Sequence, residues 1–94
     1  MEQVIAKMRA DWSVIAKARL ESGEWTAEDV KDIGAAVAVA VAAKSPDQIA
    51  MWSRWLADLA AWACAWNLIC RGAEVAMRAK AAEVKAAAAA KKAG

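Results

Sequence analysis

The sequence predicts an all-α protein: a helical bundle of three helices with a long third helix, completed by dimerisation. Alanine, glutamate, lysine, arginine and leucine dominate the 94 residues, and residues that favour strands are few. Apolar residues recur at intervals of three and four, which is the spacing of one face of a helix. The length allows a single small core, so residues 1–94 are expected to form one domain.

The first expected helix covers residues 2–21. Its apolar stripe follows the 3-4 spacing and consists of Ile5, Met8, Trp12 and Ile15, with Arg19 on the same line. Ser22 and Gly23 follow, and glycine is the usual residue just past the end of a helix.

The second expected helix covers residues 27–43 and has a strong start. Thr26 is a favourable N-cap, and Asp29 stands where the acid of a capping box belongs. Trp25, just before the cap, is expected to pack on the first turn as a hydrophobic staple. Gly34, Ala38 and Ala42 form a face of small residues, on which we expect the tryptophan rings of the third helix to rest.

The third expected helix covers residues 46–90, with 91–94 as a frayed tail. Ser45 and Pro46 suit its first positions. Arg71-Gly72 is an alternative end, but a lone glycine costs only about 1 kcal/mol inside a helix. An uninterrupted helix of this length would exceed roughly 60 Å, so the first two helices could cover only its first half.

Self-association is expected along the apolar stripe of this third helix. Six tryptophans are more large rings than one small core needs, and a homodimer would cover the exposed second half of the helix. The residues assigned to self-association are Trp52, Trp55, Leu59, Trp62, Trp66, Ile69 and Met77. The alternative is that the rings all belong to the core.

The composition argues against catalysis. The chain has no histidine and no tyrosine, and neither Cys64 nor Cys70 has a base at helical spacing to activate it. No cluster of carboxylates suggests a metal site, and no glycine-rich loop suggests a phosphate site. We therefore expect no catalytic residue, no metal and no cofactor. Arg54 and Asp58 are expected to form an ordinary surface ion pair.

A cytoplasmic protein is expected. The two cysteines lie too far apart on one helix to form a disulfide with each other, and are interpreted as buried thiols in a reducing compartment. The uncharged run of residues 59–70 is shorter than the roughly 18 residues needed to cross a bilayer. Peripheral association with a membrane through this run remains an alternative.

Charge is unevenly distributed despite a net charge of +2. Acidic residues gather around the turn between the first two helices, and the segment from Arg71 onward is basic, so the two regions could attract each other between protomers. The tail EVKAAAAAKKAG resembles, in composition, the lysine-alanine tails of some bacterial DNA-associated proteins. Binding to nucleic acid through a basic C-terminal helix is therefore an alternative function.

Protein binding is the function that the sequence favours, because tryptophan is enriched at interface hot spots. The expected partner surface is the turn region, with its tryptophans partly exposed; it comprises Trp12, Trp25, Glu21, Glu24, Glu28 and Asp29. In size and composition the chain is similar to short alanine-rich helical proteins of bacterial accessory genomes and temperate phages, many of which bind and block one host protein. The expectation is a non-enzymatic adaptor or stoichiometric inhibitor of an unidentified protein partner.

Overall fold

The computed structural model describes residues 1–61 and 68–93, and within these ranges it is helical without strands. The helices are α1 (Glu2–Ser22), α2 (Ala27–Ala43), α3 (Pro46–Ala61) and α4 (Leu68–Ala93). The predicted all-α class is confirmed. The radius of gyration is 13.0 Å, which is the value expected of a compact chain of about this length.

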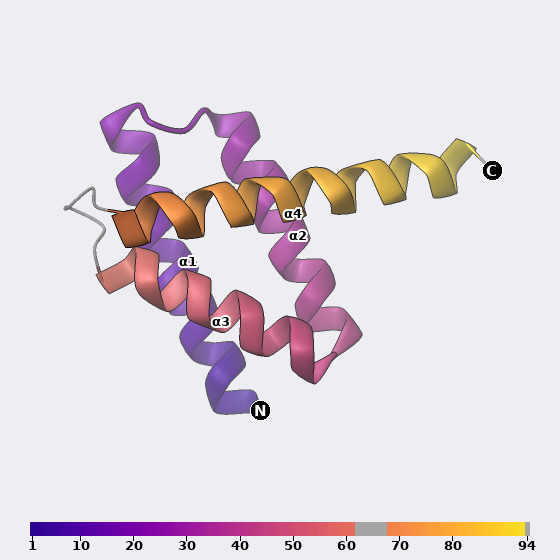
Figure 1. Ribbon diagram of the computed structural model, residues 1–94, viewed down its shortest axis with the longest axis horizontal. Coiled ribbons are helices and arrows are strands. Elements are labelled where there is room, and N and C mark those ends of the chain that lie inside the picture. The colour runs from indigo at the N-terminus through magenta and orange to yellow at the C-terminus, as the bar shows by residue number, and fades with distance from the viewer. Residues whose placement is uncertain (62–67, 94) are drawn as a thin grey trace.

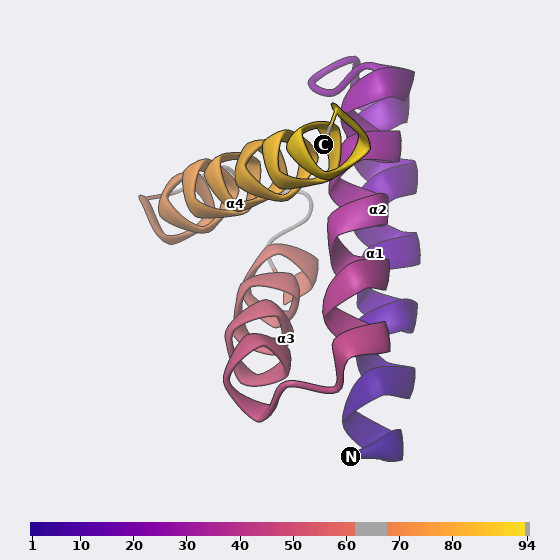
Figure 2. The ribbon, with the colours of Figure 1, turned by 90° about the vertical axis from the view of Figure 1, so that its right-hand side faces the viewer.

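The helices are arranged in two layers. α1 and α2 lie side by side and run in opposite directions, joined by the turn at Gly23 (Figure 1). α3 and α4 lie together on one side of this pair (Figure 2). α3 packs mainly against α1, and α4 packs against α2 and α3. The C-terminal end of α4 extends past the other helices (Figure 1).

The expectation of one long third helix over residues 46–90 is wrong. Two helices, α3 and α4, take its place, and they point in different directions and pack on each other (Figure 1). The longest dimension of the molecule is 42 Å, well short of the expected rod. Two shorter helices can turn their apolar faces to one core, whereas a rod would leave half of that surface exposed to water. The alternative end at Arg71-Gly72 is also not observed, because α4 is continuous through Gly72.

Local interactions define the ends of the first two helices. Gly23 ends α1 in the left-handed conformation with φ of 76°, and its N–H donates to the Leu20 carbonyl. The predicted capping box is present at the start of α2: Thr26 Oγ1 accepts from the Asp29 N–H at 3.1 Å, and Asp29 Oδ2 accepts from the Thr26 N–H at 3.0 Å. Lys44 ends α2 with φ of 52°, a conformation that is unfavourable for most residues other than glycine.

The core lies between the two layers and receives side chains from all four helices. Its largest members include Trp52, whose ring meets Trp55 edge to face with centroids 5.4 Å apart. The buried apolar set is Met8, Ile15, Trp25, Ile33, Ala36, Val37, Ala40, Ile49, Trp52, Leu56, Leu59, Cys70, Ala73, Met77 and Ala81. Alanine buries little area, so the few large side chains supply most of the hydrophobic stabilisation.

On the small-residue face of α2, Gly34 contacts Trp12 of α1, whereas Ala38 and Ala42 are exposed; of the rings expected to rest there, Trp62 and Trp66 lie outside the described residues. A Cβ atom added at Gly34 would lie 3.3 Å from Cζ2 of Trp12, so this ring rests on the glycine. The absence of a side chain at Gly34 therefore lets α1 and α2 approach each other closely.

Alanine in place of Gly72 should raise the free energy of unfolding by about 0.5–1 kcal/mol. Gly72 lies inside α4, and a Cβ there would have no atom within 4 Å, so the substitution only improves helix propensity. Thermal unfolding followed by circular dichroism should show a Tm higher by roughly 2–8 °C. As a control, Gly23→Ala should lower the Tm, because φ of 76° is unfavourable for alanine. A lower Tm for Gly72→Ala would contradict a helix that continues through this residue.

Candidate functional site

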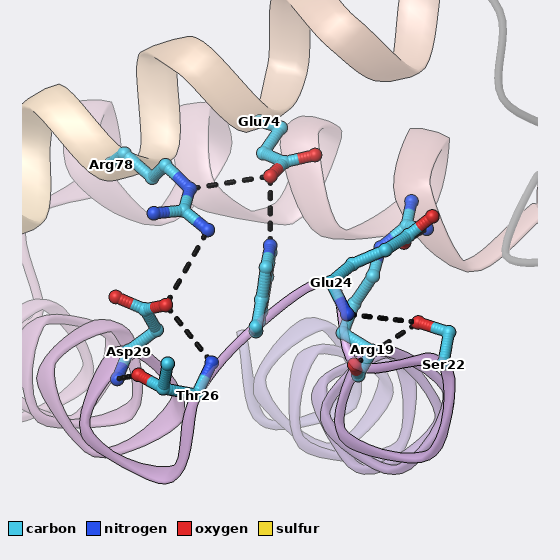
Figure 3. A network of polar contacts seen from close by, with 8 residues as sticks. Arg19, Ser22, Glu24, Thr26, Asp29, Glu74 and Arg78 are labelled. Atoms are coloured by element: carbon cyan, nitrogen blue, oxygen red, sulfur yellow. Dashed lines mark hydrogen bonds and ion pairs between the residues drawn. The ribbon is translucent and has the colours of Figure 1, made fainter.

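A polar network joins the turn between α1 and α2 to the first half of α4. At its centre Trp25 Nε1 donates to Glu74 Oε1 at 2.8 Å. The guanidinium of Arg78 lies over the Trp25 ring, 5.7 Å from its centroid. Arg78 Nε donates to the same Glu74 oxygen at 3.2 Å, and Arg78 Nη2 lies 3.6 Å from Asp29 Oδ2 (Figure 3). These contacts hold together residues that are far apart in the sequence. We call the set formed by Trp25, Asp29, Glu74 and Arg78 the Trp25 network.

Arg78 is the cation that two carboxylates share. The side chain of Glu74 is only 12% exposed, and a carboxylate in such a place is costly unless it is paired and hydrogen-bonded. The hydrogen bond from the backbone N–H of Thr26, helped by the nearby charge of Arg78, holds the pKa of Asp29 below its usual value. The capping box of α2 and the position of α4 are therefore electrostatically linked.

A second ion pair supports the turn itself. The side chain of Arg19 is almost fully buried and pairs with Glu24. The Ser22 hydroxyl donates to the Arg19 carbonyl at 3.1 Å (Figure 3). Since a buried guanidinium is strongly destabilising without a partner, Glu24 serves the fold.

Two further acids of this region, Glu28 and Asp32, pair with Lys85 of α4. Lys85 Nζ lies 3.1 Å from Asp32 Oδ2 and 3.7 Å from Glu28 Oε1. The hydrogen bond to Asp32, together with the negative charges of both carboxylates, raises the pKa of Lys85 above its usual value. The attraction between an acidic turn region and a basic C-terminal segment, expected between protomers, thus occurs within one chain.

The structure brings the predicted partner-binding residues together, but most of them are engaged in the fold. The rings of Trp12 and Trp25 lie 6.0 Å apart. Trp25 is only 2% exposed, in contrast to the expected partial exposure, because α4 packs over it. Trp12 is half-buried, and Glu21 is exposed without an ion pair to any residue that the structure describes. A role of this set in partner binding stays a prediction.

Three residues predicted for self-association lie in the core of one chain. Trp52, Leu59 and Met77 are fully buried, and Trp55 is half-buried beside Trp52. Trp62 and Trp66 lie outside the described residues, and so does the side chain of Ile69. The three buried side chains need no second chain to cover them, and self-association stays a prediction.

A groove between α1 and α2 was not anticipated from the sequence. It has a volume of about 360 Å³ and is lined by Trp12, Gly34, Val37, Ala38, Val41, Ala42 and Arg9. We call it the Trp12 groove. Arg9 is its only charged lining residue, and its guanidinium makes no ion pair with residues 1–61 or 68–93. The small-residue face of α2 was visible in the sequence, but its pairing with Trp12 depends on how the helices pack.

A larger groove lies between α1 and α3. Its volume is about 540 Å³, and it is lined by Met1, Val4, Pro46, Ile49, Ala50, Ser53, Arg54 and Ala57. We call it the Arg54 groove. Met1 and Val4 are 57% and 40% exposed at its edge. Arg54 is exposed and has no ion pair in the described part of the chain, so the expected pair with Asp58 does not form.

Two further properties bear on the chemistry of the site. Among residues 1–61 and 68–93, histidine, cysteine and acidic side chains form no group of three or more that could hold a metal ion. No helix in the same ranges combines the length and the apolarity needed to cross a membrane.

Comparison of the chain with protein-family models, curated proteins and solved structures gives no match.

Phenylalanine in place of Trp25 should lower the free energy of unfolding by about 1–3 kcal/mol. The smaller ring keeps part of the apolar contact but lacks the N–H that Glu74 accepts, and hydrogen bonds to charged groups contribute about 1.5–3 kcal/mol. Urea unfolding followed by circular dichroism measures the change. Glu21→Ala, which alters an exposed residue of the same turn, should stay within about 0.5 kcal/mol of the parent chain. Equal effects of the two substitutions would contradict a stabilising role for the Trp25 network.

Asparagine in place of Asp29 should flatten the loss of stability in acid. Because the folded-state pKa of Asp29 lies below its usual value of 3.8, its contribution is present above that value and is lost as the pH falls through the lowered one. Urea unfolding between pH 5 and pH 2 should show a smaller fall for Asp29→Asn than for the parent chain. Asp47→Asn, in the first turn of α3 and outside the network, is the control. The idea fails if both variants keep the slope of the parent chain.

Proposed function

We propose that this chain is a non-enzymatic protein-binding protein, an adaptor or stoichiometric inhibitor, that takes its partner in the Trp12 groove. One observation carries the proposal: half-buried Trp12 lies in an apolar groove, and the α2 wall of that groove consists of glycine, alanine and valine. Tryptophans in apolar pockets are the residues most enriched among interface hot spots. A groove between two helices is also a common receptor for an amphipathic helix.

Contact with Gly34 favours binding by holding the Trp12 ring in place. The ring rests against the glycine and lies 6.0 Å from the buried Trp25 ring. A side chain that is already ordered loses little entropy when a partner binds, and so contributes more to affinity. The partner that fits this surface supplies apolar side chains for the groove and a carboxylate for Arg9.

The partner surface proposed here differs from the one that the sequence suggested. Trp12 belongs to both. Trp25 and Asp29 are left out because the Trp25 network occupies them, and Glu24 and Glu28 are left out because they pair with Arg19 and Lys85. Contacts that hold the fold together are poor candidates for exchange with a partner, since breaking them would cost stability.

The same ion pairs weigh against the nucleic-acid alternative. Arg78, Lys80 and Lys85 each pair with acids of the same chain, so half of the six basic residues from Arg71 onward are already neutralised. Arg71, Lys91 and Lys92 make no ion pair with the described residues. Three charges are few for a protein whose affinity would depend on phosphate contacts.

The burial of both ends of the run proposed for membrane contact favours a cytoplasmic location over peripheral membrane association. Leu59 and Cys70, the ends of the run proposed for peripheral membrane contact, are buried in the core, which weighs against their insertion into lipid. We infer a cytoplasmic location, and the burial of the Cys70 side chain in the apolar core agrees with the interpretation of the cysteines as buried thiols.

Arginine in place of Ala38 should abolish partner capture. Ala38 is exposed and lines the Trp12 groove, so a long charged side chain there would fill the groove without disturbing the core. The matched control is Ala10→Arg, which places the same side chain on an exposed position of α1 that does not line the groove.

The measurement is affinity capture from a lysate of the source cells with the parent chain and both variants, followed by mass spectrometry. Proteins retained by the parent chain and by Ala10→Arg should be lost with Ala38→Arg. Retention of the same proteins by all three chains would place the partner surface elsewhere. Circular dichroism confirms that both variants fold.

A further inference from the structure

We propose that the Arg54 groove is a second docking surface, which binds an amphipathic helix of a partner protein through its apolar stripe and a carboxylate beside that stripe. This surface is separate from the Trp12 groove, and the proposal does not depend on the function proposed above. It rests on the shape of the groove, the exposure of its apolar edge and its charge.

The shape of the groove suits a helix. Its α3 wall consists of positions 46, 49, 50, 53, 54 and 57, which follow one face of the helix over about 16 Å, or three turns. The α1 wall is formed by Met1 and Val4. A bound helix presents its anchors at i, i+4 and i+7 over about 10 Å, so the groove is long enough to receive all three. Its volume of about 540 Å³ lies within the range typical of binding pockets.

The edge of the groove carries exposed apolar side chains. Met1 and Val4 are exposed, while Ile49 beneath them is 3% exposed and belongs to the core. Ile49 is thus buried, whereas Met1 and Val4, which line the same groove, keep a large part of their apolar surface in water. Covering them with an apolar stripe would remove them from water, which is the main favourable term in association.

The charge of the groove specifies the chemistry of the occupant. Arg54 is the only lining residue with a charged side chain, no acid lines the groove, and the guanidinium lacks an ion pair with the described residues. Near the opposite end of α1, by contrast, Arg19 and Arg78 are both paired with carboxylates. An arginine at the edge of an apolar groove favours a bidentate contact with a carboxylate. A second copy of the chain is a different occupant, and the test must separate it from a partner helix.

The experiment uses two synthetic amphipathic peptides of about 15 residues with the same leucine stripe. One carries glutamate beside the stripe and the other carries lysine. Binding is measured by fluorescence anisotropy of the labelled peptides with the full chain carrying Ala38→Arg, which fills the Trp12 groove, and with the same chain carrying in addition Arg54→Glu or, as a charge-matched control outside both grooves, Lys31→Glu. NMR chemical-shift changes of backbone amides locate the bound peptide.

The Ala38→Arg chain should bind the glutamate peptide about tenfold or more tightly than the lysine peptide. Arg54→Glu should reverse that preference, whereas Lys31→Glu should leave it unchanged, and the largest shifts should fall at Val4, Ala50 and Ala57. Equal binding of both peptides, no binding of either, or a preference that Lys31→Glu changes as much as Arg54→Glu would overturn the proposal.

Light scattering tests the second copy as occupant. The parent chain should have a mass of 10.0 kDa, or a larger mass that Arg54→Glu leaves unchanged. A mass of twice that value which falls to 10.0 kDa in Arg54→Glu would show that the groove joins two copies, and the proposal would be wrong. If the proposal for the Arg54 groove fails, the capture experiment with Ala38→Arg still tests the Trp12 groove, because the two grooves are tested by substitutions at different residues.

Discussion

The position of α4 depends on the contact in which Trp25 and Arg78 meet at the carboxylate of Glu74. Trp25 belongs to the turn between α1 and α2, whereas Glu74 and Arg78 belong to α4. An alanine-rich helix such as α4 has few large side chains with which to fix its orientation, and alanine contacts alone tolerate rotation and sliding. A directional hydrogen bond from a buried indole, with a guanidinium stacked on the same ring, specifies one orientation. Asp29 then links this contact to the capping box of α2.

The parts of the fold that the sequence predicted are those that local interactions decide. Gly23 and the Thr26–Asp29 capping box involve residues within a few positions of each other, so their sequence pattern is sufficient. The separation of α3 from α4 is different. Neither glycine nor proline stands between Ala61 and Leu68, and the one glycine that suggested an end, Gly72, lies inside α4. Helix propensity alone favours one long rod, and the burial of Trp52 and Met77 in a common core decides otherwise.

The candidate site was only partly predictable for the same reason. Tryptophan and acidic residues near the first turn indicated a special region, but their roles depend on α4, which reaches them from about fifty positions away. Seen in the sequence, Trp25 and its acidic neighbours are typical of an exposed interaction surface. In the structure Arg78 and Lys85 form ion pairs with Asp29 and Glu28, and the Trp25 ring is buried. Trp12 is half-buried, and the groove around it results from packing against Gly34, which the sequence did not indicate.

Ion pairs are distributed unevenly over the part of the chain that the structure describes. Near the turn between α1 and α2, Arg19, Arg78 and Lys85 are paired with carboxylates of the same chain. Along the N-terminal half of α1, by contrast, each of the two grooves contains one arginine and no acid. We propose the two grooves as the recognition surfaces because each combines apolar side chains with an arginine that makes no ion pair with the described residues. The two grooves lie against different helices, α2 and α3, so one partner segment cannot fill both without crossing α1. If both are occupied, the chain holds two segments at once, which is the arrangement of an adaptor; an inhibitor that blocks one partner needs only one of them.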